Sequence, residues 1–151
     1  MSDAERQRVE MLLKIRRREE QDARRAFDQV QGRGEFLRGR INELGQLLAA
    51  QNKAARQVMS APGDEAAPAY RTALTQLRQA IGEQRALLRP LEDMLRKCRA
   101  ELLEARNRRR AVETLRDRLA ARHSARRQQL EAGHLDDTHA ARLAAADEAG
   151  G

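Results

Sequence analysis

Aromatic side chains are almost missing from this chain, which has no tryptophan, one tyrosine and two phenylalanines among its 151 residues. Aromatic and β-branched side chains normally fill the thick core of a globular domain, so their scarcity argues against such a core. Charged residues make up 35% of the sequence, and a composition rich in Ala, Glu, Leu, Arg and Gln is typical of long solvent-exposed helices. We therefore expect an all-α protein that buries only a thin apolar strip.

Cysteine, long apolar runs and catalytic motifs are also scarce. The single cysteine, Cys98, cannot form an internal disulfide, which favours a reducing compartment. No apolar run approaches the roughly 18 residues of a transmembrane helix, and no signal-peptide core is present. The sequence lacks a glycine-rich phosphate loop, and its one metal-like cluster, from His134 to His139, matches no standard ligand spacing. These absences predict a soluble cytoplasmic protein that is not an enzyme and uses neither cofactor nor metal.

Apolar residues recur in alternating steps of three and four along two segments, and we call this stripe the seam. In the second segment the seam runs from Leu74 to Ala105, and in the first it runs from Val9 to Val58. A stripe that narrow is what a helix presents to one partner helix rather than to a broad core. The first seam is weak near its start, where charged residues occupy it, and the second resumes past Leu102 at positions Val112, Leu115 and Leu119, then thins to Arg126 and Leu130.

Capping and helix-breaking residues predict where the two helices begin and end. Ser2 and Glu5 have the spacing of a capping box, and the only clear break, residues 60–67, contains a Pro-Gly turn signal. We expect helices over about 3–59 and 68–132, the second stopping at Gly133, with both in one domain over residues 1–133. Residues 134–151 are expected to form a C-terminal tail with one short helix and a disordered end.

A short loop between two long helices makes an antiparallel hairpin, in which the numbers of facing residues should sum to about 129. This register places Ile41 opposite Leu88, and it places Glu20 opposite Arg109, so two charged seam positions meet as a pair of opposite sign. The sequence thus predicts a long antiparallel two-helix coiled coil that folds on itself as a monomer. Pairing between two chains stays open as the alternative.

Glycine and arginine are both unevenly distributed. Each of four glycines in the middle of the first helix lowers helix stability by on the order of 1 kcal/mol relative to alanine, which predicts a soft segment. One of them, Gly34, is expected to face Leu95, so that a small residue lies against a large one. The net charge of +7 implies acidic partners, and arginine clusters gather toward the open end of the hairpin. These clusters fit a solvated face with ion pairs within each helix, or a basic plug for an acidic protein cavity. Nucleic acid is not expected, because no aromatic residues interleave with the arginines and both signs of charge are mixed.

Four segments, in this order and spacing, resemble the flagellar FliJ family of type III export and, more distantly, its injectisome counterparts of the YscO type. The resemblance covers nearly the whole chain. It is carried by Leu12–Glu20 (LLKIRRREE) with Ala23 and Ala26, by Tyr70–Ile81 (YRTALTQLRQAI), by Glu104–Arg106 leading to Val112–Leu115, and by Glu131 followed by Leu135–Asp137.

The resemblance implies a stalk similar in shape to the rotor coiled coil of rotary ATPases. Its terminal ends would enter the hexameric export ATPase, its loop-proximal half would contact the export-gate membrane protein, and the protein would escort export chaperones. Such a protein is cytoplasmic and peripherally associated with the inner membrane at the flagellar base. Matching positions put the gate contact on Leu44, Leu48, Gln51, Ala73, Leu77, Ala80 and Gln84. By charge and location, the expected ATPase contact comprises Arg16, Arg17, Arg18, Arg109, Arg116 and Arg118.

Two questions stay open at the level of the sequence. A basic coiled-coil protein that binds nucleic acid or acts as a scaffold is the alternative function. The residues do not decide between a flagellar system and an injectisome.

Overall fold

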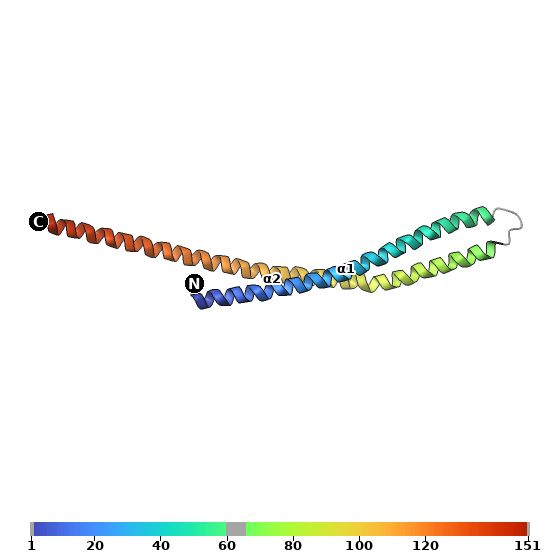
Figure 1. Ribbon diagram of the computed structural model, residues 1–151, viewed down its shortest axis with the longest axis horizontal. Helices are drawn as coiled ribbons and strands as arrows, with labels where there is room; N and C mark the ends of the chain where they lie inside the picture. Colours follow the sequence, from blue (N-terminus) through green and yellow to red (C-terminus); the bar gives the residue numbers. More distant parts are fainter. Residues whose placement is uncertain (1, 60–65, 151) are drawn as a thin grey trace. The chain divides into compact units, whose positions relative to one another are not determined.

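The computed structural model describes residues 2–59 and 66–150, and these residues form two helices (Figure 1). Helix α1 spans Asp3–Met59 and helix α2 spans Ala67–Gly150. The predicted all-α helical hairpin is confirmed, together with the predicted bounds of its first helix. The second helix begins one residue earlier than expected. Residues 60–65 of the predicted loop lie outside the described residues.

The first turn of α1 is closed by the predicted capping box. The backbone amide of Glu5 donates to the Ser2 hydroxyl at 3.2 Å, and the backbone amide of Ser2 donates to the Glu5 carboxylate at 3.3 Å. The amide of Arg6 also donates to the Ser2 carbonyl oxygen at 3.0 Å. Two donors that the helix itself leaves without partners are therefore satisfied at its start.

Helix α2 does not stop at Gly133, so the expected end at residue 132 and the separate tail are wrong. The helix continues through Pro90 and Gly133 to Gly150, and Gly133 does not adopt the left-handed conformation that ends helices at glycine. A single glycine costs a helix only about 1 kcal/mol, and the alanine-rich residues 140–146 are strong helix formers. The residues of the predicted disordered end are helical as far as Gly150, and Gly151 lies outside the described residues.

The chain divides into two compact units, and each contains one stretch of α1 packed against one stretch of α2. The terminal unit consists of Met1–Glu20 and Ala105–Gly151, and the central unit consists of Gln21–Glu104. Both units follow the predicted antiparallel register. In the terminal unit Glu20 contacts Arg109 as predicted, and in the central unit Arg38 lies 3.8 Å from Glu92, within one residue of the predicted register.

The core of the terminal unit is small. Val9, Leu13 and Val112 form one buried cluster, against which Leu12 and Leu119 pack. Leu13 has no exposed surface, and it is the largest fully buried side chain among the described residues. The predicted seam is wrong at one point in this unit, because Leu115 is 45% exposed and the half-buried Arg116 takes the seam position. A step of four from Val112 reaches residue 116, and a residue one position away points about 100° off the seam.

Past its contact with α1, helix α2 continues as a single helix. Residues 125–150 are exposed at every position except Thr138, and they include Leu130, Leu135 and Leu143. Figure 1 shows this segment of α2, coloured orange to red, extending beyond the blue first turn of α1. Since the register reaches the first residues of α1 near residue 126 of α2, no part of α1 is left to cover it.

The central unit buries a longer aliphatic seam. Val30, Ala55, Leu74 and Ile81 are buried, and Cys98 occupies a half-buried seam position. At one edge the Arg99 guanidinium lies 5.9 Å from the centre of the Phe27 ring, within the range of a cation–π contact.

The glycines of α1 are not required by packing. A Cβ atom built on Gly34 would meet only the Arg38 guanidinium, at 3.7 Å, and one built on Gly32, Gly39 or Gly45 would meet nothing within 4 Å. The expectation that Gly34 is small because Leu95 lies against it is therefore wrong.

Candidate functional site

Charged residues replace aliphatic ones on the seam of the terminal unit, where they form one connected network. The Arg109 guanidinium donates to the Glu20 carboxylate on α1 and, at 2.8 Å, to the Glu113 carboxylate one turn along α2. Arg17 of α1 approaches Glu113 at 3.7 Å. The side chains of Arg109 and Glu20 are both 21% exposed, so this pair is partly shielded from water.

The hydrogen bonds of the network favour the charged forms of Arg109 and Glu113. Hydrogen bonds to Glu20 and then Glu113 raise the pKa of Arg109, and the hydrogen bond from Arg109 lowers the pKa of Glu113. Because Arg109 is only 21% exposed and has two carboxylate partners, it presents no free charge to an outside molecule, whereas the side chain of Arg17 is 53% exposed.

Two open depressions in the terminal unit gather cationic side chains. Their volumes are about 410 and 310 Å³. Five arginines line them against three carboxylates, so their surface is basic. The arginines are Arg6, Arg116, Arg122, Arg126 and Arg127, and the carboxylates are Glu5, Glu10 and Asp117. We call these two hollows the basic depressions.

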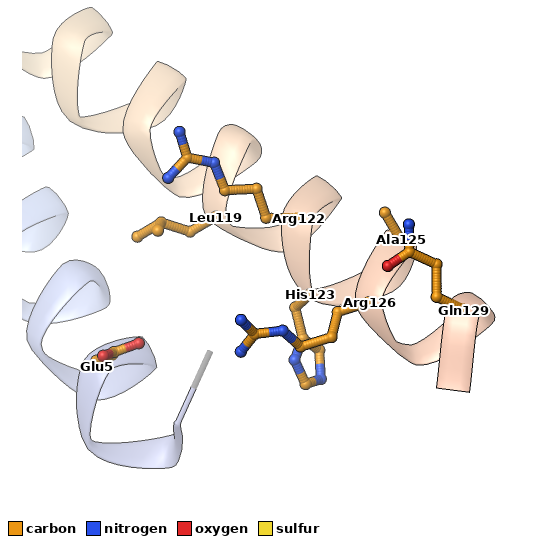
Figure 2. Close-up of a pocket in the computed structure, with 7 residues that line it drawn as sticks. All are labelled: Glu5, Leu119, Arg122, His123, Ala125, Arg126 and Gln129. Atoms are coloured by element: carbon orange, nitrogen blue, oxygen red, sulfur yellow. The ribbon is translucent and has the colours of Figure 1, made fainter. Parts of the chain in front are cut away.

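Figure 2 shows the larger basic depression, in which His123 and Arg126 project from neighbouring turns of α2. Arg126 extends toward the first turns of α1, where Glu5 lies. The first turns of α1 and the turns of α2 around His123 and Arg126 thus line opposite sides of one basic depression. A carboxylate-bearing segment of another protein is the chemistry that this surface suits.

The six arginines predicted to contact an ATPase do not form one surface. Arg16 pairs with Glu19 at 3.0 Å, Arg17 and Arg109 belong to the seam network, and Arg18 and Arg118 are exposed outside the basic depressions. Only Arg116 lines a basic depression. Sequence reasoning missed four of the lining arginines, Arg6, Arg122, Arg126 and Arg127. Continuing the seam through residues 116, 119 and 123 leads to Arg126, and Arg122 and Arg127 flank it there.

An apolar depression of about 430 Å³ lies in the central unit. Leu47 and Gln51 come from α1, while Ala73, Gln76, Leu77 and Ala80 come from α2. Leu47 is 52% exposed, so part of its apolar side chain is open to a partner. The small side chains of Ala73 and Ala80 leave the hollow in which a larger apolar side chain of a partner fits.

Four of the seven residues predicted to contact the export gate come together in the apolar depression: Gln51, Ala73, Leu77 and Ala80. The other three, Leu44, Leu48 and Gln84, occupy half-buried seam positions that do not line it. Leu47 and Gln76 were missed. Leu47 directly precedes the seam residue Leu48, so its place at the edge of the seam was visible in the heptad pattern.

The described ranges contain neither a candidate metal-ion site nor a candidate membrane span. Residues 2–59 and 66–150 contain no group of three or more His, Cys, Asp or Glu side chains that could hold a metal ion. In particular His134, Asp136, Asp137 and His139 do not form such a group. Neither described helix has a stretch apolar enough to cross a membrane.

The fold and these surfaces define a class: a helical hairpin whose candidate contacts are open surfaces on paired helices. The family described as Flagellar FliJ protein matches residues 5–148. The chain belongs to this family, and the resemblance seen in the sequence is confirmed. Membership implies a role related to flagellar protein export. No curated protein and no solved structure matches the chain.

Proposed function

We propose that this chain is a non-enzymatic stalk and adaptor of the flagellar type III export apparatus. Its terminal unit inserts into the hexameric export ATPase, and its central unit contacts the export-gate membrane protein. It also escorts export chaperones, works as a monomer when free, and stays in the cytoplasm as a peripheral component at the inner membrane. Family membership over residues 5–148 carries the proposal and favours it over the nucleic-acid or scaffold alternative.

The basic depressions support an ATPase contact in the terminal unit. They combine Arg122, Arg126 and Arg127 from α2 with Arg6 from α1, so both helices contribute charge to the same surface. An acidic rim or pore attracts such a surface at long range and orients it before contact. The proposed ATPase contact therefore consists of the arginines that line the basic depressions. Of the six arginines expected from the sequence, it keeps only Arg116.

The apolar depression supports a gate contact in the central unit. An exposed leucine beside two alanines forms an apolar surface with room for a partner side chain, and burial of such a surface favours binding. Since the apolar and basic depressions belong to different units, the two contacts use separate residues.

The ATPase contact is tested by hydrolysis assays with the cognate export ATPase. Replacing Arg122, Arg126 and Arg127 by Gln should reduce stimulation of ATP hydrolysis several-fold. A variant with Gln at Arg33, Arg56 and Arg89 of the central unit, which removes the same charge, should stimulate normally. Absence of stimulation by the unmodified chain at low salt would contradict the proposal, and tight, steeply salt-dependent DNA binding would favour the alternative.

The gate contact is tested by binding to the cytoplasmic domain of the gate protein. The double change Leu47→Gln and Ala80→Arg should weaken binding at least tenfold, because it adds polar groups to the apolar depression. The control carries Leu103→Gln and Ala100→Arg, which alter an equally exposed leucine and an exposed alanine elsewhere in the central unit. Equal losses for the two variants would reject the apolar depression as the contact.

A further inference from the structure

Charged side chains bridge α1 and α2 along one edge of the seam. In the central unit Arg38 pairs with Glu92, and in the terminal unit Arg17 pairs with Glu113. All four residues directly follow a seam residue in the sequence, so they flank the seam on the same side of their helices. At these two places on the edge an arginine of α1 meets a carboxylate of α2.

Three arginines on the same edge of α2 have no such partner. Arg71, Arg78 and Arg85 precede Glu92 in exact steps of seven residues, and all three are exposed. We call them the arginine edge. None of them forms an ion pair with a described residue, in contrast to Arg38 and Arg17.

The opposite helix explains why these arginines stay without a carboxylate. Steps of seven from Arg38 along α1 lead to Gly45 and Asn52, which face Arg85 and Arg78 in the observed register. Both are neutral, and Gly45 has no side chain; a Cβ built on it would meet nothing within 4 Å. The hairpin thus forms interhelical ion pairs elsewhere on this edge, whereas Arg71, Arg78 and Arg85 form none with a described residue.

An acidic α-helix suits the arginine edge better than nucleic acid or a membrane surface does. Seven helical residues rise about 10.5 Å, so a partner helix with a carboxylate at every seventh residue matches all three cations at once. Nucleic acid is disfavoured because none of the exposed edge positions carries an aromatic side chain to stack on a base. A membrane surface is disfavoured because the residues flanking the edge, Thr75 and Gly82, are small rather than large and apolar.

The arginine edge is distinct from the apolar depression of the same unit. Ala73 and Ala80 directly precede the seam residues Leu74 and Ile81, whereas the arginines directly follow seam positions. The two surfaces therefore flank opposite sides of the seam, and partners can occupy both together. We propose that Arg71, Arg78 and Arg85 bind an acidic α-helix of a partner protein that carries carboxylates at heptad spacing. This inference does not depend on the export role.

The probe is a fluorescein-labelled, hydrocarbon-stapled helical peptide of alanine and glutamine with glutamate at every seventh position. Its control peptide carries glutamine at those positions. Binding to the full chain is measured by fluorescence anisotropy at low and high salt. The variant R71Q/R78Q/R85Q should bind the acidic peptide about tenfold more weakly, since each exposed pair contributes a few tenths to 1 kcal/mol. The charge-matched control R33Q/K53Q/K97Q, which removes three exposed cations of the central unit that do not flank the arginine edge, should change affinity less than twofold.

A charge exchange separates a direct contact from a general charge effect. The single variant R78E should lose affinity for the acidic peptide and regain it for a peptide whose central glutamate is lysine. The proposal is overturned if the acidic peptide does not bind, if both triple variants lose affinity equally, or if the exchanged pair fails to recover binding. It is also overturned if duplex DNA or anionic vesicles bind more tightly than the peptide and depend equally on the arginine edge.

Discussion

The terminal and central units use the same two helices but hold them together with different chemistry. In the terminal unit a cluster of three buried aliphatic residues is followed along the seam by Glu20, Arg109 and Arg116. In the central unit most seam positions are aliphatic, and the buried ones include Val30 on α1 and Leu74 and Ile81 on α2. Aliphatic seam positions contribute by burial, whereas partly exposed ion pairs contribute little stability and mainly fix register.

This difference separates the proposed tasks of the two units. The charged seam of the terminal unit fixes which residues of α1 and α2 face each other, and it leaves the basic depressions with an excess of arginine. The aliphatic seam of the central unit holds the two helices together by burying apolar surface. One of its edges remains available for an apolar contact and the other for a charged contact. The stability of the terminal unit should therefore rest on few residues, and that of the central unit on many.

The largest effect is expected from Leu13→Ala, which removes the fully buried side chain of the terminal unit. Loss of a buried leucine should lower the free energy of unfolding by about 3 kcal/mol, measured by urea denaturation with circular dichroism. Amide exchange should show the loss in the terminal unit while the central unit stays protected. Leu115→Ala, at a leucine that is 45% exposed, is the control and should have a much smaller effect. Equal destabilisation by both changes would break the comparison.

A stabilising effect of the opposite sign is expected in the central unit. Gly32→Ala, Gly34→Ala and Gly39→Ala should each raise the free energy of unfolding by up to about 1 kcal/mol, since alanine favours a helix and the added methyl meets no obstacle. Thermal melts of the single and triple variants measure this gain. Gly133→Ala lies in the single-helix segment of α2, so it should leave the midpoint of hairpin unfolding unchanged. A lower midpoint for Gly34→Ala would mean that a neighbour does require glycine there.

The smallest effect is a pH dependence confined to the terminal unit. The hydrogen bond from Arg109 lowers the pKa of Glu113 below its ordinary value of 4.5 in the folded chain. Its contribution to stability is therefore fully present above pH 4.5 and is lost as the pH falls through the lowered value. Amide exchange, corrected for intrinsic rates, should show protection of the terminal unit falling over this range. Glu113→Gln should abolish that part of the dependence, and an unchanged profile in this variant would assign it to other groups.

Much of the fold was predictable from the sequence because one narrow seam determines it. Steps of three and four located both helices, and the short loop between them set a register that places Glu20 opposite Arg109, where the two side chains do contact each other. The end of α2 was not predictable from Gly133, since the effect of one glycine depends on the helix formers around it.

The candidate surfaces were harder to predict because they depend on which side of the seam a residue flanks. Leu47 and Arg127 each lie one residue from a predicted seam position, and a single step along a helix turns a side chain by about 100°. Arg109 was predicted as a contact because it is charged, yet its guanidinium is held by Glu20 and Glu113. Charge in a sequence does not distinguish an arginine that pairs internally from one that faces a partner.

Cys98 gives the molecule a built-in reporter. Its thiol is the only one in the sequence and sits half-buried between the helices of the central unit. Separation of the helices exposes this thiol further, so its rate of labelling by a thiol-reactive dye should rise with the frequency of that separation. If a docked partner slows that reaction, the separation of α1 from α2 has become part of what the partner controls.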